Sequence, residues 1–303
     1  METRVADPAR TTDLQGAARY RQRSWWQNLF APIRRKPLGA VGALIILTMG
    51  LTAIAAPYIA PHDPLDIDSS VLLVGPQPDY PLGTDDFGRD ILSRLIFGAR
   101  ISLQVGLLAV GLGTTTGAML GLVGGYVGGR LDFVIQRVMD SLMAFPMLVL
   151  ALAMVAALGP SLRNVILALA VVMVPNSCRV VRSSVLSVRE MCYVEAARAV
   201  GCPDLRVMFR HILPNCLAPY IIMATAGLGS AILSEASLSF LGLGTPAPAP
   251  SWGSMLSGTT QQYMYDAPWL AVFPGMAITL AVFGFNFLGD ALRDILDPRL
   301  RGQ

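Results

Sequence analysis

The sequence is poor in charged residues and contains a single lysine. Charged residues make up 14% of the 303 positions, whereas soluble domains carry roughly 25%. An ATP-binding P-loop needs a lysine behind a glycine-rich turn, in the pattern G-x-x-x-x-G-K-[ST]. No such turn precedes Lys36. The chain therefore lacks the usual means of gripping nucleotide phosphates, and any energy from hydrolysis must come from another chain.

Histidine and cysteine are also scarce, which argues against a catalytic or metal site. By the topology below, His62 and His211 fall on opposite sides of a membrane, so they cannot share a Ser/His/Asp or Cys/His site. The four cysteines form no C-x-x-C pair and are Cys178, Cys192, Cys202 and Cys216. We expect no zinc site, no cofactor and no enzymatic activity in this chain.

What the sequence does contain is long apolar segments. Uncharged runs fill 38–60, 101–129, 141–162, 164–178, 215–234, 236–265 and 267–289. About 20 apolar residues are enough to cross some 30 Å of hydrocarbon. The sequence therefore predicts an all-α integral membrane protein of about six helices, near 38–60, 101–126, 133–158, 162–182, 216–242 and 269–291.

The arginines give this protein an orientation. Of the 23 Lys and Arg residues, those on one side of the membrane are only Arg89, Arg94, Arg100 and Arg163. Since positive charge marks the cytoplasmic side, both termini are expected to be cytoplasmic. The predicted regions are a tail at 1–37, a first span at 38–60, an external loop with an amphipathic segment at 61–100, a core at 101–291 and a tail at 292–303.

Glycines recur every four residues in the second predicted helix, at Gly113, Gly117, Gly121 and Gly125. Such a stripe lets membrane helices approach closely. We expect it to be a packing surface.

The core contains a polar cytoplasmic excursion at 183–214. Residues 190–200 favour helix, and Gly201 is suited to end it. Pro203 fits the first turn of a second helix. That helix would carry one apolar stripe, made of Leu205, Met208, Phe209, Ile212 and Leu213. We expect two short helices joined at a glycine just below the bilayer.

This excursion also carries a family signature. Glu195-Ala196-Ala197, Gly201 and Ile212-Leu213-Pro214 match the pattern E-A-A-x3-G-x10-I-L-P. The chain thereby resembles the permease subunits of ABC importers, in which this loop is the coupling helix that seats in a groove on the ATPase subunit. The resemblance implies a type I ABC importer transmembrane domain. The alternative is an amphipathic hairpin on the lipid surface.

Further motifs cover most of the chain and resemble the second-permease class of the dipeptide/oligopeptide/nickel importers. They are Gly83-Thr-Asp-Asp-Phe-Gly-Arg-Asp90, Arg210-His-Ile-Leu-Pro-Asn215, Glu235-Ala-Ser-Leu-Ser-Phe-Leu-Gly-Leu-Gly244, Trp252-Gly253, Asn286-Phe-Leu-Gly-Asp290 and Leu296-Asp-Pro298. Two positions depart from the family pattern. Ser251 stands where many members carry an acid, and Ala291 replaces a frequent glycine.

The resemblance implies an importer subunit in the bacterial inner membrane, working by alternating access on peptides. Nickel, glutathione or another small solute are alternative cargoes. The implied partners are a second homologous permease, two cytoplasmic ATP-binding subunits and an external substrate-binding protein. No nucleic acid is expected.

Two further groups of residues are functional candidates. Arg89, Asp90, Arg94 and Trp252 lie in the outer loops and are candidates for contact with the binding protein. The alternative is that they pair locally with neighbours.

Asp140 and Glu235 are acids inside predicted spans and are candidates for the translocation pathway, or else structural acids. An ion-coupled secondary transporter would need such acids, but the sequence has no clear inverted repeat. A membrane scaffold is a third possibility, for which the excursion at 183–214 would be dispensable.

Overall fold

The computed structural model describes residues 37–296, except for the side chains of Thr259 and Gln261. The predicted tails therefore lie mostly outside the described residues. The chain divides into two units, Met1–Pro37 and Leu38–Gln303. Its described part is helical, and the sole β feature in that part is an isolated bridge between Thr84 and Asp90.

Five helices are long and apolar enough to cross a membrane. They are α2 (Pro37–Ile54), α4 (Ile91–Val127), α7 (Leu162–Arg189), the continuous helix Asp204–Phe240 and α13 (Trp269–Leu296). A sixth span is present if α5 (Gly129–Met143) and α6 (Met147–Leu158), bent by 89°, count as one. By length and composition, the prediction of about six membrane helices is confirmed.

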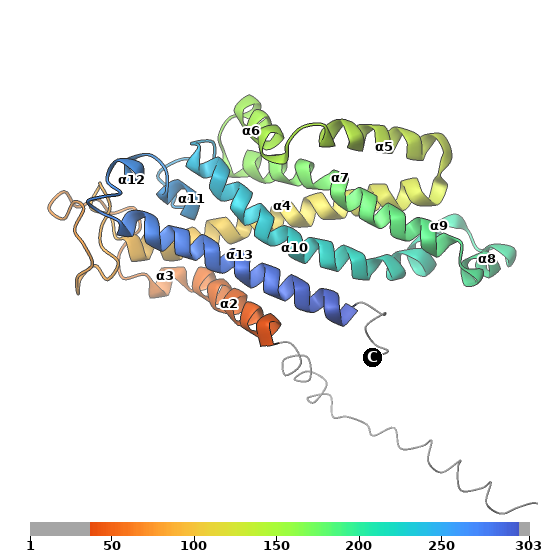
Figure 1. Ribbon diagram of the computed structural model, residues 1–303, viewed down its shortest axis with the longest axis horizontal. Coiled ribbons are helices and arrows are strands. Elements are labelled where there is room, and N and C mark those ends of the chain that lie inside the picture. The colour runs from red at the N-terminus through yellow and green to blue at the C-terminus, as the bar shows by residue number, and fades with distance from the viewer. Residues whose placement is uncertain (1–36, 297–303) are drawn as a thin grey trace, which may run out of the picture. The chain divides into compact units, whose positions relative to one another are not determined.

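Short helices gather at the two ends of the long ones (Figure 1). At one end α8 (Cys192–Ala199) and α9 (Asp204–Arg206) follow α7. At the other end lie α11 (Trp252–Met255), α12 (Thr259–Gln262) and the loop before α4, with α3 (Ala56–Ile59) directly after α2. The arginine distribution makes the α8 end the inner one.

The outer loop is shorter than the predicted 61–100. Helix α4 begins at Ile91, where Asp90 in extended conformation accepts hydrogen bonds from the Leu92 and Ser93 amides at 3.3 and 2.9 Å. An aspartate N-cap of this kind satisfies amides that have no partner within the helix. The last ten residues of the predicted external loop with its amphipathic segment are thus the first part of α4, a helix long and apolar enough to cross a membrane.

The predicted single helix at 133–158 is broken in the structure. Pro146 stands between α5 and α6 in extended conformation. A proline has no backbone N–H to donate and disfavours helical conformation in the residue before it. The apolar run on both sides of the proline predicted one straight span, but the chain turns through 89° between α5 and α6.

The predicted excursion at 183–214 is also shorter and differently built. Helix α7 continues to Arg189, and α9 leads through the π-helix η2 (Val207–Ile212) into α10 (Leu213–Phe240) without interruption. The expected second short helix is therefore the beginning of a membrane span. We call residues 190–214 the coupling segment.

The π-helix also divides the predicted apolar stripe. Met208 and Ile212 are buried, whereas Leu205 and Phe209 are exposed. A π-turn pairs residues five apart instead of four, so the inward face changes register and Val207 becomes buried as well.

Helix α4 packs along α7 through the glycine stripe, as predicted. A Cβ atom on Gly113, Gly117 or Gly121 would lie only 2.3–2.4 Å from a carbonyl oxygen of α7. The close approach is fastened by the Ser177 hydroxyl, which donates to the Thr114 carbonyl at 2.7 Å. The two helices therefore form the rigid centre of the described unit.

Replacing Gly117 by leucine should force α4 and α7 apart and destabilise the protein by about 1–3 kcal/mol or more, as overpacking of a tight interface does. Gly111→Leu is the matched control, because Gly111 lies in the same helix with nothing within 4 Å of its would-be Cβ. Thermal unfolding in lipid nanodiscs measures both variants. Equal unfolding temperatures for the two would contradict the packing described.

Candidate functional site

The coupling segment presents an apolar surface outside the membrane-spanning helices. Val200 is 82% exposed and Leu205 is 69% exposed. Met191, Tyr193 and Phe209 are exposed nearby in the sequence. Exposed apolar side chains gathered in one short segment mark a surface that is normally covered by a partner.

The turn at Gly201 fixes the shape of this segment. Gly201 has φ +80°, a left-handed conformation that strongly favours glycine. Its amide donates to the Arg198 carbonyl at 2.9 Å, and the Cys202 amide donates to the Ala197 carbonyl at 3.0 Å. This is a Schellman turn, so the predicted helix end at Gly201 is confirmed.

The side of α8 that faces away from solvent is packed into the core. Val194 is fully buried in a cluster that joins the inner ends of α4, α7 and α10, whose other members include Leu122, Val185, Val207, Ile212 and Cys216. A well-packed cluster of this kind transmits displacement, because its side chains have little free volume.

Polar contacts reinforce the same anchor. The Tyr126 hydroxyl at the end of α4 donates to Asp204 at 2.5 Å, and the Arg198 guanidinium lies 5.0 Å from the centre of the Tyr126 ring. Arg189 donates to the Gly125 carbonyl at 3.0 Å. Both parts of the coupling segment, α8 through Arg198 and α9 through Asp204, thus contact the inner end of α4.

A second polar contact joins α8 to the start of α10. The Asn215 amide donates to the His211 carbonyl at 2.8 Å and to the Tyr193 hydroxyl at 3.0 Å. The Tyr193 hydroxyl in turn lies 3.3 Å from the same carbonyl. These bonds cross from one arm of the coupling segment to the other.

The seven residues of the predicted signature are brought together in this one segment but have different surroundings. Glu195, Ala196, Gly201 and Pro214 are exposed, Ala197 and Leu213 are half-buried, and Ile212 is fully buried. The first group is accessible at the surface, and Ile212 belongs to the buried cluster that contains Val194.

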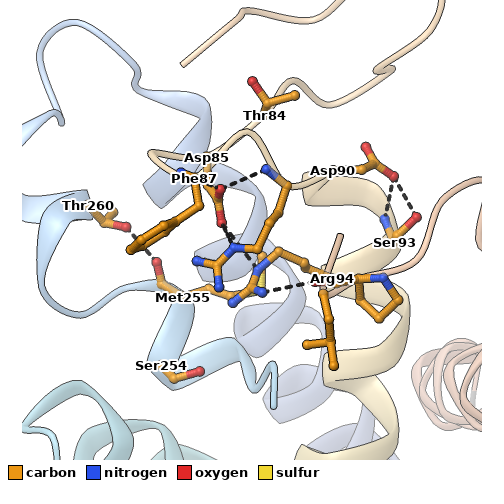
Figure 2. A network of polar contacts seen from close by, with 12 residues as sticks. Thr84, Asp85, Phe87, Asp90, Ser93, Arg94, Ser254, Met255 and Thr260 are labelled. Carbon is orange, nitrogen blue, oxygen red and sulfur yellow. Dashed lines mark hydrogen bonds and ion pairs between the residues drawn. The ribbon is translucent and has the colours of Figure 1, made fainter. Parts of the chain in front are cut away.

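At the outer end, an ionic cluster ties two loops to α4 (Figure 2). Asp85 accepts from the Arg89 guanidinium at 2.7 Å and from the Arg89 amide at 2.9 Å, and it lies 3.5 Å from Arg94. Arg94 also donates to the Pro64 carbonyl at 3.1 Å. A small cavity of about 50 Å³ separates these groups from Ser254 and Thr260 of the second outer loop.

Three of the four residues proposed to meet a binding protein are buried. Asp90 caps α4, Arg94 belongs to the ionic cluster, and Trp252 is only 1% exposed, with its indole N–H donating to the Leu95 carbonyl at 3.0 Å. Local pairing therefore describes them better than direct contact. Arg89 is also engaged but is partly exposed. The exposed outer side chains include Phe87.

Glu235 is completely buried between α4 and α10. Its carboxylate accepts hydrogen bonds from the hydroxyls of Ser102 at 3.1 Å and Ser239 at 2.7 Å. The Ser251 hydroxyl donates to Ser239 at 3.4 Å. Ser251, which departs from the family pattern, thus extends the hydroxyl set around this acid, and Glu235 joins helices instead of lining an open path.

Asp140 is partly exposed, but it is paired. Arg179 of α7 donates to it at 2.5 Å. Asp132 binds Arg182 of α7 in a bidentate manner at 2.5–2.6 Å. These two ion pairs add to an apolar contact in which Met139, Ile135 and Leu142 of α5 pack with Val174 and Cys178 of α7.

Sequence reasoning missed the anchoring residues Tyr126, Asp132, Asp204 and Asn215. Their partners lie 22 to 78 residues away in the chain, and no local spacing reveals such pairs. Asp85 was within a recognised motif, and its place one helical turn before Arg89, with Arg94 following, was the available signal. Within residues 37–296, no group of three or more His, Cys, Asp or Glu is placed to hold a metal ion.

Two family models match this chain. One is described as "Binding-protein-dependent transport system inner membrane component" and matches residues 113–302. The other is described as "N-terminal TM domain of oligopeptide transport permease C" and matches residues 24–76.

Full-length or nearly full-length relatives are 40–46% identical to the chain in sequence. The dipeptide transport system permease protein DppC of Alkalihalophilus pseudofirmus is 46% identical, over 99% of this chain and 100% of that protein. DppC of Haemophilus influenzae is 45% identical, over 86% and 90%. The glutathione transport system permease protein GsiD of Pectobacterium atrosepticum is 40% identical, over 92% and 93%.

Solved structures agree on the fold. Two inward-facing structures of the MetNI methionine ABC transporter match with TM-scores of 0.56 and 0.54 and identities of 20% and 19%. The alignments cover 68% and 67% of this chain, and 98% and 96% of the matched chains. At this level of identity the likeness concerns the fold.

Replacing Asp85 by asparagine should loosen the outer loop, because Arg89 and Arg94 lose their shared carboxylate in a largely buried site. Breaking a buried ion pair costs about 3 kcal/mol. Hydrogen exchange of residues 61–90 should accelerate. The matched control is Asp79→Asn, since Asp79 is exposed in the same loop. Unchanged exchange in the Asp85 variant would exclude a structural role for the cluster.

Proposed function

Because the chain belongs to the family of binding-protein-dependent transport system inner membrane components, we propose that it forms half of a peptide importer's pathway and is driven by a separate ATPase docked on the coupling segment. It has the fold of a type I ABC importer transmembrane domain and is a component of the bacterial inner membrane. The observation that carries the docking proposal is the exposed apolar face on a buried anchor.

In this proposal the coupling segment transmits movements of the ATPase to the membrane helices. Its outward face carries Val200 and Leu205, which are apolar and exposed. Its inward face carries Val194, which belongs to a buried cluster with side chains of α4, α7, η2 and α10. A push on α8 therefore reaches α4, α7 and α10 together, as required for rigid-body alternation between two access states.

The proposed partners supply what this chain does not, namely ATP hydrolysis, the other half of the pathway and the delivery of cargo. Two cytoplasmic ATP-binding subunits supply the energy, one on each coupling segment of a pair of permeases. The second permease is a homologous subunit. An external substrate-binding protein delivers cargo to the outer surface, which carries exposed side chains such as Phe87 beside the ionic cluster. No catalytic role is assigned to this chain.

Dipeptides and short oligopeptides are the proposed cargo. This proposal rests on the relatives named as dipeptide permeases, which are 45–46% identical to the chain. A glutathione permease at 40% identity makes that tripeptide-like thiol the second candidate. Uptake by the assembled importer of labelled dipeptide, competed with excess glutathione, distinguishes the two.

An ion-coupled secondary transporter is less well supported. Such a carrier needs an acid that meets the transported ion or proton in the pathway. Glu235 is sealed from solvent by serine hydroxyls, and Asp140 is paired with Arg179. Reconstituting the chain alone in vesicles with an ion gradient tests this alternative, and uptake under those conditions would revive it.

The turn at Gly201 should be required for coupling. Gly201→Val places a β-branched residue at φ +80° and costs about 1–2 kcal/mol locally. We expect substrate-stimulated ATP hydrolysis and uptake to be lost while the complex still reaches the membrane.

Gly242→Val is the matched control for this variant. Gly242 also has φ +80° and ends α10 in the same type of turn, with its amide donating to Ser239 and that of Leu243 to Leu238. It lies at the other end of the long helices. Equal loss of coupling in the two variants would refute a specific role for Gly201.

The exposed face should bind the ATPase directly. Leu205→Asp puts a charge in the proposed interface and should cost about 2 kcal/mol, or roughly 30-fold in affinity. Co-purification of the ATPase with the permease, titrated in detergent, measures this loss. Leu72→Asp changes an exposed leucine of the outer loop and should have no effect. Undiminished binding by the Leu205 variant would move the interface elsewhere.

A further inference from the structure

Helix α2 approaches α13 closely at its inner end and separates from it farther out. A Cβ on Gly39 would lie 2.2 Å from the Ala291 Cβ, and one on Gly42 would lie 2.7 Å from the Gly284 carbonyl oxygen. Beyond these glycines most α2 side chains are larger, whereas Gly50 has no atom within 4 Å of its would-be Cβ. The two helices therefore enclose a space in the outer half of the spans.

That space is a cavity of about 280 Å³ between α2, α4, α11 and α13. Its walls include Met49, Ala99, Trp252, Phe273 and Ala277. Packed protein interiors contain few voids larger than one water molecule. A cavity of this size needs an occupant or costs the wall atoms their contacts.

The walls offer water no free donor, and the only side-chain oxygen acceptors on them are the lone pairs of two threonine hydroxyls. The Thr48 hydroxyl donates to the Ile45 carbonyl at 2.8 Å, and the Thr52 hydroxyl donates to the Thr48 carbonyl at 2.8 Å. The Trp252 indole N–H is used by the Leu95 carbonyl. Since a buried water needs two to four polar partners, the occupant must be apolar.

The cavity opens on the lipid-facing side of the spans. Two wall residues of α13, Met276 and Leu280, are 54% and 46% exposed, and Thr48 of α2 is exposed as well. All three belong to helices that cross the membrane. The solvent at this opening is therefore hydrocarbon.

We propose that the acyl chain of a bilayer phospholipid enters this cavity and completes the packing between α2 and the rest of the protein. An engineered apolar cavity of about 150 Å³ holds benzene, so this one has room for about ten chain carbons. A turn of α-helix about 10 Å wide and 5.4 Å long needs more space, which disfavours a helix of a partner subunit.

Trp252 provides the test, because its ring lines the cavity and is otherwise buried. The importer complex, carrying Trp25, Trp26 and Trp269 changed to phenylalanine, is placed in vesicles of phosphatidylcholine brominated near the middle of one acyl chain. Bromine quenches indole emission at close range. We expect a several-fold loss of Trp252 emission relative to unbrominated vesicles.

Filling the cavity provides the control. Ala277→Leu occupies the space and should restore most of the Trp252 emission, whereas Ala43→Leu, at an exposed position of α2, should leave the quenching unchanged. The proposal is overturned if brominated vesicles do not quench Trp252, which would indicate a side chain of a partner subunit as the occupant. It is also overturned if Trp252 is quenched as strongly in the Ala277→Leu variant as in the unfilled protein.

If the triple phenylalanine variant does not assemble, Trp252→Phe in the otherwise natural chain gives the Trp252 contribution by difference. The same outcomes then apply. The result is independent of the cargo and of ATPase docking, so it can fail without affecting the proposed function.

Discussion

The burial of Val194, a residue of α8, is the contact on which the rest of the structure depends. It packs a short helix against η2 and the end of α7, in a buried cluster that also includes side chains from the inner ends of α4 and α10. Without this contact the exposed apolar face could bind a partner but could not move the pathway. The Tyr126–Asp204 hydrogen bond ties the segment to α4, and the Arg189–Gly125 hydrogen bond ties the end of α7 to α4.

The middle of the protein obeys the rule that polar groups in a membrane must be satisfied internally. Glu235 has two hydroxyl donors, and the Ser177 hydroxyl caps a carbonyl of the neighbouring helix. Charged groups otherwise concentrate toward the ends, in the Asp85 cluster outside and in the arginine-rich segment inside. The protein thus has a tightly packed centre, and its ion pairs gather toward the two ends of the long helices.

The sequence was sufficient to predict the helical membrane fold, its orientation and the position of the turn at Gly201. Apolar run length and arginine distribution are properties of single segments, and a glycine in a left-handed turn is set by its own backbone. The glycine stripe likewise predicted the α4–α7 contact. What could not be predicted depends on distant parts of the chain. The bend at Pro146 and the π-helix at Val207–Ile212 change which face of a helix is buried.

The outer candidates illustrate the same limit. Arg94 and Trp252 sit in motifs that suggest an external contact, but their partners are Asp85, Pro64 and Leu95, which make them structural. A motif records that a residue matters and leaves open whether it faces solvent or the core.

The central claim is that the coupling segment and the membrane helices move as one body, and a distance measurement tests it most directly. Spin labels on the exposed Cys192 and on Leu217→Cys of α10 report the distance within one permease, in the assembled importer with and without ATP. The account predicts an unchanged distance within the subunit, while the distance from the Cys192 label to a label on the coupling segment of the second permease changes. A shift or broadening of the intrasubunit distance on ATP binding would contradict it.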